Sequence, residues 1–395
     1  MKIRSLSLVC MLGMLATLAI AQSPDLNHIY AHTPIRIADI PFSPNNPTGT
    51  LPAQWKAAYG INRVPSQGAG QTIALVDAFD DPNIASDLAF YANYFHFTPC
   101  NFTKVKVGNP ITGQGWDVEE SLDVEQACAI APQANIVLVE ANSNSFADLL
   151  AAVQVAYQQE HATIVSMSWG GGEFSGEQSS DSVFCNITNE DGKPVTFFAS
   201  TGDGGHGTEY PSVSPCVIAV GGTVLALASA NTPASPTQIN YGSEHGWSQG
   251  SGGVSSEEAQ PSWQNPACSA FSTTNRCVPD ISSDASNIPV YDTFSEGGWL
   301  PVAGTSISSP DWASFMGLVN SMRAAAGNPL FTMAAQDLYT QFYGSNYHTD
   351  FHDITTGNNG NCGAQCMSGP GYDLVTGIGT FQANNLYIPL VADPN

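Results

Sequence analysis

The stretch ANIVLVEANSNSFADLLAAVQVAYQQEHATIVSMSWG, residues 134–170, alternates between two kinds of hydrophobic pattern. Residues 134–141 and 162–170 are apolar and rich in β-branched side chains, whereas apolar residues recur at helical spacing over 146–160. Near-continuous apolar strands are typical of sheets covered on both faces, and a helix is the usual connection between parallel strands. The stretch therefore predicts a strand–helix–strand unit of a parallel sheet.

The same alternation continues in both directions along the chain. Further apolar strands are expected at 71–79, 195–200 and 216–222, and a helix at 306–327. Residues 224–300 are rich in Ser, Gly and Pro with weak periodicity, so we expect long surface loops of the same domain there. Together these patterns predict an α/β fold: one domain with a parallel sheet and helices on both of its faces.

The composition limits the classes of partner. The 395 residues include 34 Asp and Glu against 10 Lys and Arg, a formal net charge of −24. Such an acidic chain repels DNA, RNA and anionic membranes, so no nucleic-acid or membrane partner is expected. The negative charge is compatible with a protein that works in an acid medium, where protonation of carboxylates reduces their mutual repulsion. It is equally compatible with a protein that is merely kept soluble by its charge, and the composition does not distinguish these two explanations.

The N-terminus has the pattern of an export signal. Two basic residues precede an apolar run at 6–20, and residues 19–21 (Ala-Ile-Ala) fit the rule for a cleavage site. We expect a signal peptide at 1–21 and a secreted mature protein. The run is short for a membrane span, and no later stretch approaches about 20 apolar residues. The Pro- and Asn-rich residues 22–50 are expected to form an extended lead-in.

The cysteines indicate disulfides. Cleavage after residue 21 would leave an even number, which favours disulfides in an exported chain. The sequence does not fix the pairing, and pairing between neighbours along the chain is our interpretation. Cys362 and Cys366 could also be half of a zinc site, but no matching Cys or His pair lies nearby. The cysteines are Cys100, Cys128, Cys185, Cys216, Cys268, Cys277, Cys362 and Cys366.

Polar residues follow several of the predicted strands. In parallel sheets, binding and catalytic sites lie at this edge, beyond the carboxyl ends of the strands. Ser306 follows a Gly-Thr pair at the start of the helix predicted at 306–327, and Asp203 follows the strand at 195–200. A serine at a helix N-terminus can be a nucleophile beside N–H groups that stabilise an oxyanion, or a simple helix cap. This segment alone leaves both interpretations open.

A nucleophilic serine needs a base, and there are two candidates. Asp77, His206 and Ser306 have the chain order of an Asp-His-Ser triad, but His206 lies in a glycine-rich loop, where a surface histidine is the better interpretation. Glu119 and Asp123 stand four apart in a segment with a helical pattern, so their carboxyl groups share one helix face about 5–6 Å apart. The acid pair is therefore the better base.

In combination these motifs resemble the sedolisins, the serine-carboxyl peptidases, which share the subtilisin-like fold but use glutamate in place of histidine. The resemblance runs from about residue 51 to residue 386, and the joint order and spacing of its motifs are more specific than any one of them. The motifs are Glu119-x-x-x-Asp123 in a helix that runs to Ala131-Pro132, Gly202-Asp203 after a strand, and Gly304-Thr305-Ser306 with Pro310.

The resemblance implies a single catalytic domain of subtilisin-like fold over residues 51–390. Ser306 would be the nucleophile, Glu119 the general base, and Asp123 the partner that orients Glu119 and shares its proton. Asp203 would lie in the oxyanion hole with the backbone N–H of Ser306. Because two nearby carboxyl groups share a proton and the base must be deprotonated, we expect a bell-shaped activity profile centred in acid.

Three further residues, Asp77, Trp169 and Gly170, are candidates for a role near the active site. Asp77 either extends the proton network, as an acid on this strand does in some sedolisins, or is a turn residue at a strand end. Trp169 and Gly170 are candidates for the substrate groove, where an extended peptide can pair with their backbone. A tryptophan of the hydrophobic core is the alternative for Trp169.

The C-terminal segment resembles the calcium site of the sedolisins at about residues 350–380. Its candidate ligands are the carboxylates of Asp353 and Asp373 and the backbone carbonyls of Ile354, Gly369 and Gly371. Hard oxygen ligands around glycine turns suit calcium. We expect one structural calcium ion, and a glycine-rich loop with incidental acids is the alternative.

The expected function is that of a secreted, monomeric, acid-active serine endopeptidase that acts on proteins or peptides. The alternatives are a tripeptidyl peptidase of the same family, a catalytically silent relative that binds peptides or carbohydrate, and a calcium-dependent adhesion protein. Most sedolisins carry a long N-terminal prodomain, and the lead-in at 22–50 is too short for one, so the mode of maturation stays open.

Overall fold

The computed structural model describes residues 24–228, 240–331 and 334–394, and the predicted signal peptide lies outside them. Among these residues, no helix combines the length and apolarity needed to cross a bilayer. The α-helices of the described residues are α1 (Pro52–Ala58), α2 (Ile84–Tyr94), α3 (Asp117–Ile130), α4 (Phe146–Gln158), α5 (Asn265–Cys268), α6 (Thr305–Ala326), α7 (Ala334–Tyr343), α8 (Tyr347–Asp350) and α9 (Ala383–Ala392).

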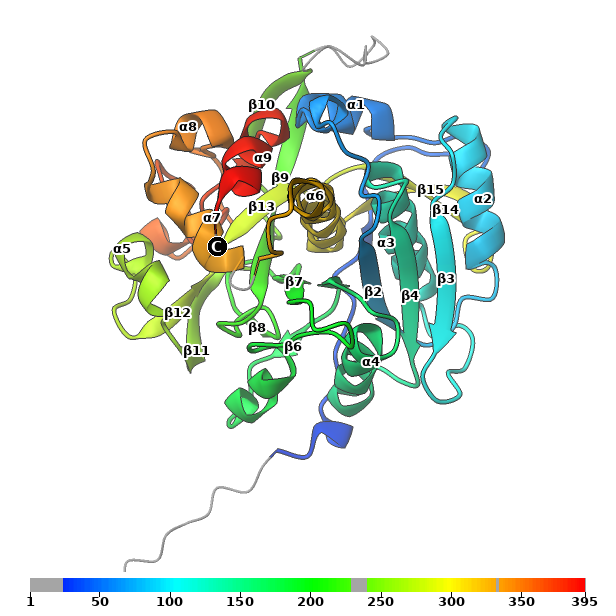
Figure 1. Ribbon diagram of the computed structural model, residues 1–395, viewed down its shortest axis with the longest axis horizontal. Coiled ribbons are helices and arrows are strands. Elements are labelled where there is room, and N and C mark those ends of the chain that lie inside the picture. The colour runs from blue at the N-terminus through cyan, green and yellow to red at the C-terminus, as the bar shows by residue number, and fades with distance from the viewer. Residues whose placement is uncertain (1–23, 229–239, 332–333, 395) are drawn as a thin grey trace, which may run out of the picture.

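A large, mostly parallel sheet forms the centre of the molecule. Its order is β16-β17-β13-β9-β7-β5-β2-β4-β3, and β10 pairs with β9. Figure 1 shows α6 in the middle, with β2, β4 and β3 on one side of it and β9 and β13 on the other. The strands of this sheet are β2 (Thr72–Ala78), β3 (Asn101–Lys106), β4 (Asn135–Ala141), β5 (Ile164–Met167), β7 (Thr196–Ser200), β9 (Ile218–Leu227), β10 (Tyr241–Gly246), β13 (Ile281–Asp284), β16 (Phe351–His352) and β17 (Thr380–Phe381).

The remaining strands of the described residues form small sheets at the periphery. One has the order β1-β15-β14, and the other two are the pairs β11–β12 and β6–β8. These strands are β1 (Arg36–Ile37), β6 (Gly171–Gly172), β8 (Glu209–Tyr210), β11 (Gly253–Ala259), β12 (Asn275–Val278), β14 (Ile288–Asp292) and β15 (Gly298–Ala303).

Strand β2 shows why the sheet is covered on both faces. Ile73 and Leu75 belong to a core cluster that contains the apolar residues of α3 and α6. Ala74 and Val76 belong to a second cluster that contains those of α4. Successive side chains of a strand point to opposite faces, so an uninterrupted apolar run produces two cores.

The predicted strand–helix–strand unit is confirmed as β4, α4 and β5, with β2 paired in parallel between the two strands. The prediction of surface loops at 224–300 is wrong, because the described part of this segment contains β10 to β15. Strand β13 lies in the central sheet, parallel to β9. It was missed because three of its four residues, Ser282, Ser283 and Asp284, are polar and yet fully buried.

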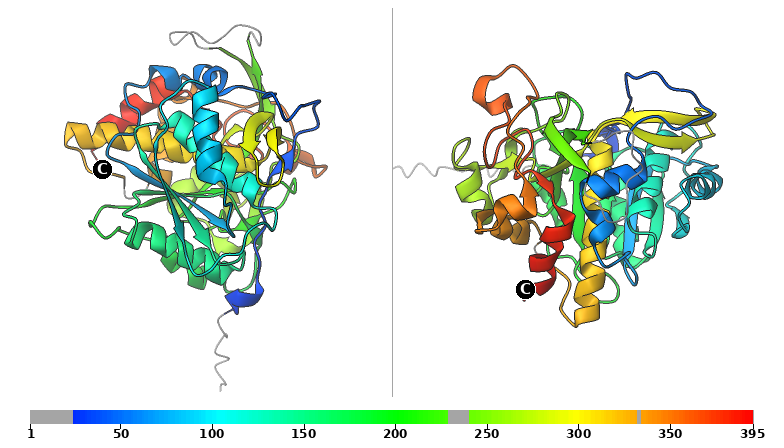
Figure 2. Two further views of the ribbon diagram at one scale, coloured as in Figure 1. Left: turned by 90° about the vertical axis from the view of Figure 1, so that its right-hand side faces the viewer. Right: turned by 90° about the horizontal axis from the view of Figure 1, so that it is seen from above.

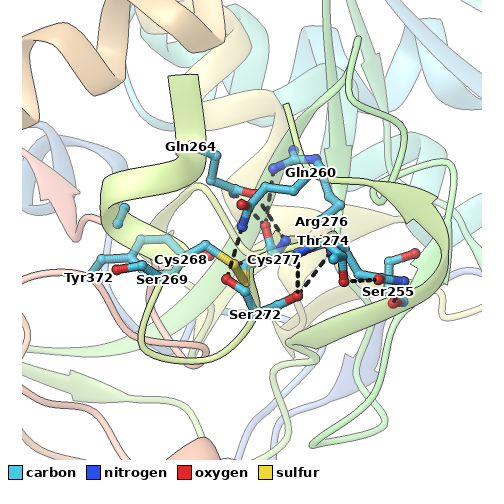
Figure 3. The surroundings of a disulfide bond; sticks show 12 residues. Ser255, Gln260, Gln264, Cys268, Ser269, Ser272, Thr274, Arg276, Cys277 and Tyr372 are labelled. Carbon is cyan, nitrogen blue, oxygen red and sulfur yellow. Dashed lines mark hydrogen bonds between the residues drawn. A yellow bond between two sulfur atoms is a disulfide. The ribbon is translucent and has the colours of Figure 1, made fainter. Parts of the chain in front are cut away.

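The disulfides confirm the pairing between neighbours: Cys100–Cys128, Cys185–Cys216, Cys268–Cys277 and Cys362–Cys366. The last pair rules out the zinc interpretation for these two cysteines, because both sulfurs are used. Figure 3 shows the Cys268–Cys277 bridge, which joins α5 to β12. Beside it, the Gln264 amide donates to the Cys277 carbonyl at 2.6 Å and accepts from its N–H at 3.0 Å.

Candidate active site

The first turn of α6 places Ser306 against helix α3. The Ser306 hydroxyl donates a hydrogen bond to Oε2 of Glu119 at 2.9 Å, and both residues are fully buried. The two residues are 187 positions apart in the sequence, and the packing of α3 against α6 brings them together. A serine hydroxyl within hydrogen-bond reach of a carboxyl group has the geometry of a nucleophile with its base.

Glu119 and Asp123 lie one helical turn apart on α3, both fully buried. Burial raises the pKa of Glu119 well above its usual range, and the nearby Asp123 and Asp77 raise it further. Burial likewise raises the pKa of Asp123 well above its usual range, with Asp77 adding to the effect. Glu119 Oε1 and Asp123 Oδ2 have no hydrogen-bond partner among the described residues. Protons are therefore held in this cluster to higher pH than in free carboxyl groups.

Ser168 joins the acid pair to the serine helix. Its hydroxyl donates to Asp123 Oδ1 at 2.8 Å and lies 3.3 Å from the Ser306 carbonyl oxygen. Pro310, four residues after Ser306, has no N–H and cannot close the helical hydrogen bond to that carbonyl. The Ser168 hydroxyl lies within hydrogen-bond distance of both Asp123 Oδ1 and this carbonyl oxygen, and its single proton can be donated to only one of them at a time.

Asp203 lies three residues after β7 and faces the start of α6. Its Oδ1 accepts from the N–H of Thr305 at 2.9 Å and from the Thr305 hydroxyl at 3.0 Å. Its Oδ2 is buried without a hydrogen-bond partner among the described residues. Burial raises the pKa of Asp203 to about 8, although the hydrogen bonds from Thr305 oppose the shift. A carboxyl group of this pKa is protonated in acid and can donate a hydrogen bond from Oδ2.

Asp77 is a buried member of the acid cluster, so the turn-residue interpretation is wrong. It lies within β2, paired with Glu140 of β4, and both of its carboxyl oxygens lack a hydrogen-bond partner among the described residues. Burial, together with the nearby Glu140, raises the pKa of Asp77 to about 8.

The described part of the lead-in runs along the site, and its strand β1 pairs with β15 (Figure 2). His32 and Gly170 exchange backbone hydrogen bonds, from His32 N to Gly170 O at 2.9 Å and from Gly170 N to His32 O at 3.2 Å. On the opposite edge, Tyr30 pairs with Ser145. Further along, the Arg36 guanidinium donates to the Asp203 carbonyl oxygen at 2.7 Å. An extended segment paired on both edges is a common geometry of a peptide bound to a protein.

Gly304 permits this close approach. Its φ of +157° is one that residues with a side chain rarely adopt, and a Cβ placed there would clash with the Pro34 carbonyl oxygen and would lie 3.0 Å from Asp203 Oδ2. Glycine therefore leaves the space in which a peptide backbone lies against the start of the serine helix.

The two groove candidates have different outcomes. Gly170 uses its backbone as expected of a groove residue, although its partner here is the chain's own lead-in. The Trp169 side chain is fully buried in the core against Phe146, and its indole donates to the Val76 carbonyl at 2.8 Å. The Trp169 ring therefore belongs to the hydrophobic core, and a groove role for its backbone stays a prediction.

His206 is an exposed loop residue, which confirms the interpretation from the sequence. Its N–H donates to the Asn359 carbonyl at 2.7 Å, and its ring lies near Cys362 and Cys366. The hydrogen-bond partner of the Ser306 hydroxyl is Glu119. The arrangement is therefore not an Asp-His-Ser triad.

The five calcium candidates come from two loops that the structure brings together. The Gly371 N–H donates to Asp353 Oδ1 at 3.0 Å, and the Gly369 N–H donates to Asp373 Oδ2 at 2.9 Å. Ile354, the residue after Asp353, is buried. Two carboxylates and the backbone carbonyls of glycine turns form an all-oxygen donor set, which fits a hard cation.

Several residues of the site were missed from the sequence. Thr305 and Ser168 are adjacent to recognised motifs, and the Gly-Thr-Ser and Ser-Met-Ser-Trp stretches contained the signal for them. His32, Arg36 and Glu209 gave no such signal, because their place in the cleft depends on how the lead-in and β8 fold back onto the sheet edge.

The buried acids predict that the protein is more stable in acid. Burial raises the pKa of Asp77, Asp203 and Asp284 to about 8 in each case. In the unfolded chain these groups titrate near pH 4, so their contribution to stability is complete below about pH 4 and is lost as the pH rises toward about 8. We expect the midpoint of thermal unfolding to fall over this range, as circular dichroism would measure.

The matched variant for this prediction is Asp284→Asn, because Asp284 accepts hydrogen bonds from Leu225 N and from Ser286 outside the acid pair. The variant lacks the titrating proton and should flatten part of the dependence on pH. A protein that unfolds at a higher temperature at pH 8 than at pH 4 would contradict the expectation.

Comparisons with known proteins fit this geometry. The model of the Subtilase family matches residues 117–338. Kumamolisin of Bacillus sp. (strain MN-32) is 30% identical over 363 residues, covering 85% of this chain and 62% of that protein. Sedolisin of Pseudomonas sp. (strain 101) is 26% identical over 370 residues, covering 86% and 60%. Further relatives are named tripeptidyl-peptidases or probable ones, among them SED2 of Arthroderma otae, at 28% identity.

A solved structure shows the same fold. It is Pseudomonas sedolisin, a serine-carboxyl proteinase, complexed with two molecules of pseudo-iodotyrostatin. The TM-score is 0.74 at 23% identity, and the match covers 89% of this chain and 100% of that one.

The family match spans more than half of the chain, and the chain therefore belongs to the subtilase family, within its sedolisin group. The resemblance and the fold predicted from the sequence are confirmed. The chain spans about three-fifths of the length of kumamolisin and sedolisin, with 62% and 60% covered.

Proposed function

We propose that this protein is an acid-active peptidase in which Ser306 attacks the peptide carbonyl and Glu119 is the general base. The observation that carries the proposal is the hydrogen bond from the Ser306 hydroxyl to Glu119 Oε2, at 2.9 Å. Burial and the neighbouring acids raise the pKa of Glu119, which makes it a stronger base, and a pair that shares one proton with Asp123 retains one carboxylate in acid, where a histidine would be fully protonated. A base of this kind therefore suits catalysis in an acid medium.

Each step of the reaction has a residue in reach. Glu119 accepts the hydroxyl proton as the Ser306 oxygen forms a bond to the carbonyl carbon of the substrate. Glu119 then gives this proton to the leaving amine, the peptide bond breaks, and an ester on Ser306 remains. A water molecule, deprotonated by Glu119, hydrolyses the ester and releases the second product with the Ser306 hydroxyl restored.

The other acids assist the charges that develop. The protonated Oδ2 of Asp203 and the backbone N–H of Ser306 would donate to the oxyanion, a contribution worth roughly 10²–10³ in rate. A proton held by Asp123 would offer a donor to Glu119, whose Oε1 has no other hydrogen-bond partner among the described residues. Asp77, close to both, would extend this network.

The lead-in supports the class of substrate and the mode of cleavage. Residues 29–37 lie extended in the groove, so an unfolded peptide is the ligand that the groove fits. The chain continues beyond the groove on its amino side, where η1 (Leu26–His28) precedes Tyr30. A groove open at that end favours an endopeptidase. A tripeptidyl peptidase is the second candidate, because several relatives have that name.

A digestion tests the proposed function. The full chain is incubated with a denatured protein between about pH 2 and pH 8, and the products are sized by mass spectrometry. We expect activity that peaks in acid and products of mixed length. Products of three residues alone would favour the tripeptidyl peptidase, and no cleavage at any pH after prolonged acid incubation would contradict the proposal. Prolonged incubation is included because a substrate must displace the lead-in to reach the buried Ser306.

Secretion and calcium binding complete the proposal. The N-terminal pattern supports export, and the all-oxygen donor set at Asp353, Asp373 and the carbonyls of Ile354, Gly369 and Gly371 supports one structural calcium ion. When bound, the ion would neutralise the two carboxylates and hold the two loops together. The two aspartates already accept hydrogen bonds from the glycine loop, which orients it.

Removal of calcium is expected to lower stability. At free calcium about 1,000-fold above its dissociation constant, binding contributes about 4 kcal/mol to the free energy of unfolding. We expect the midpoint of thermal unfolding to fall when a chelator is added, and to recover with calcium. Asp353→Ala should unfold at the chelated midpoint with or without calcium, whereas the surface variant Asp191→Asn should respond like the parent. An unfolding midpoint that is independent of calcium in the parent would refute the site.

A further inference from the structure

Glu209 has a carboxylate beside the lead-in. The proposed mechanism gives this carboxylate no role. It lies on β8, which pairs with β6, and β6 directly follows Gly170. Its Oε1 lies 3.4 Å from Nε2 of His32, the lead-in residue that pairs with Gly170. The side chain of Glu209 is 14% exposed, against 57% for His32.

Two glycines make room for this carboxylate. A Cβ at Gly170 would lie 2.6 Å from Glu209 Oε2, and a Cβ at Gly202 would lie 2.5 Å from Oε1. Any side chain at either position would therefore push the Glu209 carboxylate out of place. Both glycines also belong to the site, one as the backbone partner of the bound segment and the other as the residue before Asp203.

One oxygen of the Glu209 carboxylate faces His32, and the other lacks a partner among the described residues. Its Oε2 is buried and has no hydrogen bond among the described residues. A buried acceptor left unpaired is unfavourable, and more so when it is charged. The hydrogen bond from His32 raises the pKa of that imidazole, as expected where a cation is favoured next to Glu209.

The segment in the cleft matches the acidic wall in charge. A small cavity between the lead-in and the wall is lined by His32 and Arg36 from one side and by Asp203 and Glu209 from the other. The Arg36 guanidinium lies 4.0 Å from Asp203 Oδ2 and donates to its carbonyl oxygen. Both basic side chains of the segment that crosses the cleft thus face an acid.

We propose that Glu209 determines specificity, by selecting substrates that carry a cationic side chain at the position His32 occupies. The inference rests on the proposed peptidase function and adds the class of substrate to it. Histidine, lysine and arginine are all cationic in acid, so each can pair with Glu209 there. A neutral side chain leaves the buried carboxylate unpaired, which is the basis of discrimination by polar pockets.

The first test compares cleavage of a randomised peptide library by the parent chain and by Glu209→Gln. The parent should favour His, Lys or Arg at one position on the amino side of the cut. A charge-assisted hydrogen bond is worth about 1.5–3 kcal/mol, so the variant should lose this preference by roughly ten- to a hundredfold in kcat/KM. Asp191→Asn, a matched loss of a surface carboxylate beside His161, should keep it.

The second test does not need turnover. In the Ser306→Ala chain, nuclear magnetic resonance follows the titration of His32, and Glu209→Gln should lower the pKa of this imidazole. Cleavage without a basic preference, or a preference that survives in Glu209→Gln, would overturn the inference. If no peptide is cleaved, the proposed function fails. In that case, if the pKa of His32 is the same in Glu209→Gln, the inference fails as well. If the pKa of His32 falls in Glu209→Gln, the contact between His32 and Glu209 is supported independently of cleavage.

Discussion

Replacing Ser306 by alanine should abolish proteolysis, with a loss of roughly 10⁴- to 10⁶-fold in kcat. The substitution removes the oxygen that attacks the substrate. The hydroxyl makes one hydrogen bond, to Glu119, so the fold should be kept at a cost of about 1 kcal/mol. Release of peptides from a denatured protein, followed in acid, measures the loss.

Ser309 provides the matched control on the same helix. It is also fully buried, and its hydroxyl is hydrogen-bonded to the Ser166 hydroxyl at 2.8 Å. Ser309→Ala should keep nearly full activity, because its hydroxyl is hydrogen-bonded to Ser166 and not to Glu119 or Asp123. Comparable activity in Ser306→Ala and the parent would show that the nucleophile is elsewhere.

Replacing Glu119 by glutamine should lower kcat by roughly 10²- to 10⁴-fold, the usual contribution of general-base catalysis. Glutamine keeps the length of the side chain and can still accept a hydrogen bond from Ser306, but it cannot take up the proton. The expected loss is therefore in kcat, with KM little changed. Initial rates over a range of substrate concentrations separate the two parameters.

Glu120→Gln is the control for this variant. Glu120 is the next residue on α3 and is equally buried, and its Oε2 accepts from the Asp81 N–H at 2.9 Å, away from Ser306. Equal losses in the two variants would mean that α3 has been disturbed as a whole. A Glu119→Gln enzyme as active as its parent would exclude Glu119 as the base.

The parts of the fold that the sequence predicts are those with uninterrupted patterns. Strands β2 and β4 and helices α4 and α6 were expected within a few residues of their bounds, because each has an apolar pattern over most of its length. Strand β13 could not be recognised, since its buried Ser282 and Ser283 lie in a polar environment that other elements supply. The Ser283 hydroxyl, for example, donates to Asp311 of α6 at 2.9 Å.

Some residues of the candidate site could likewise be predicted from the sequence, and others could not. Glu119 and Asp123 could be placed together because helical spacing is local, and Ser306 because a motif marks the start of its helix. The path of the lead-in could not be predicted, because His32 and Gly170 are hydrogen-bonded through their backbone atoms. Backbone hydrogen bonds of this kind do not require particular side chains, so the sequence does not reveal them. The contact between His32 and Glu209 depends on the path of the lead-in, so it could not be predicted either.

The most direct test of the central claim is to trap the acyl group on Ser306. The full chain is mixed in acid with a reactive peptide ester, the reaction is quenched, and the adduct is located by intact-mass measurement and peptide mapping. We expect one acyl group, on the peptide that contains Ser306, which forms slowly in Glu119→Gln and is absent in Ser306→Ala. Turnover without an adduct, or an adduct on another residue, would contradict a mechanism in which Glu119 activates Ser306.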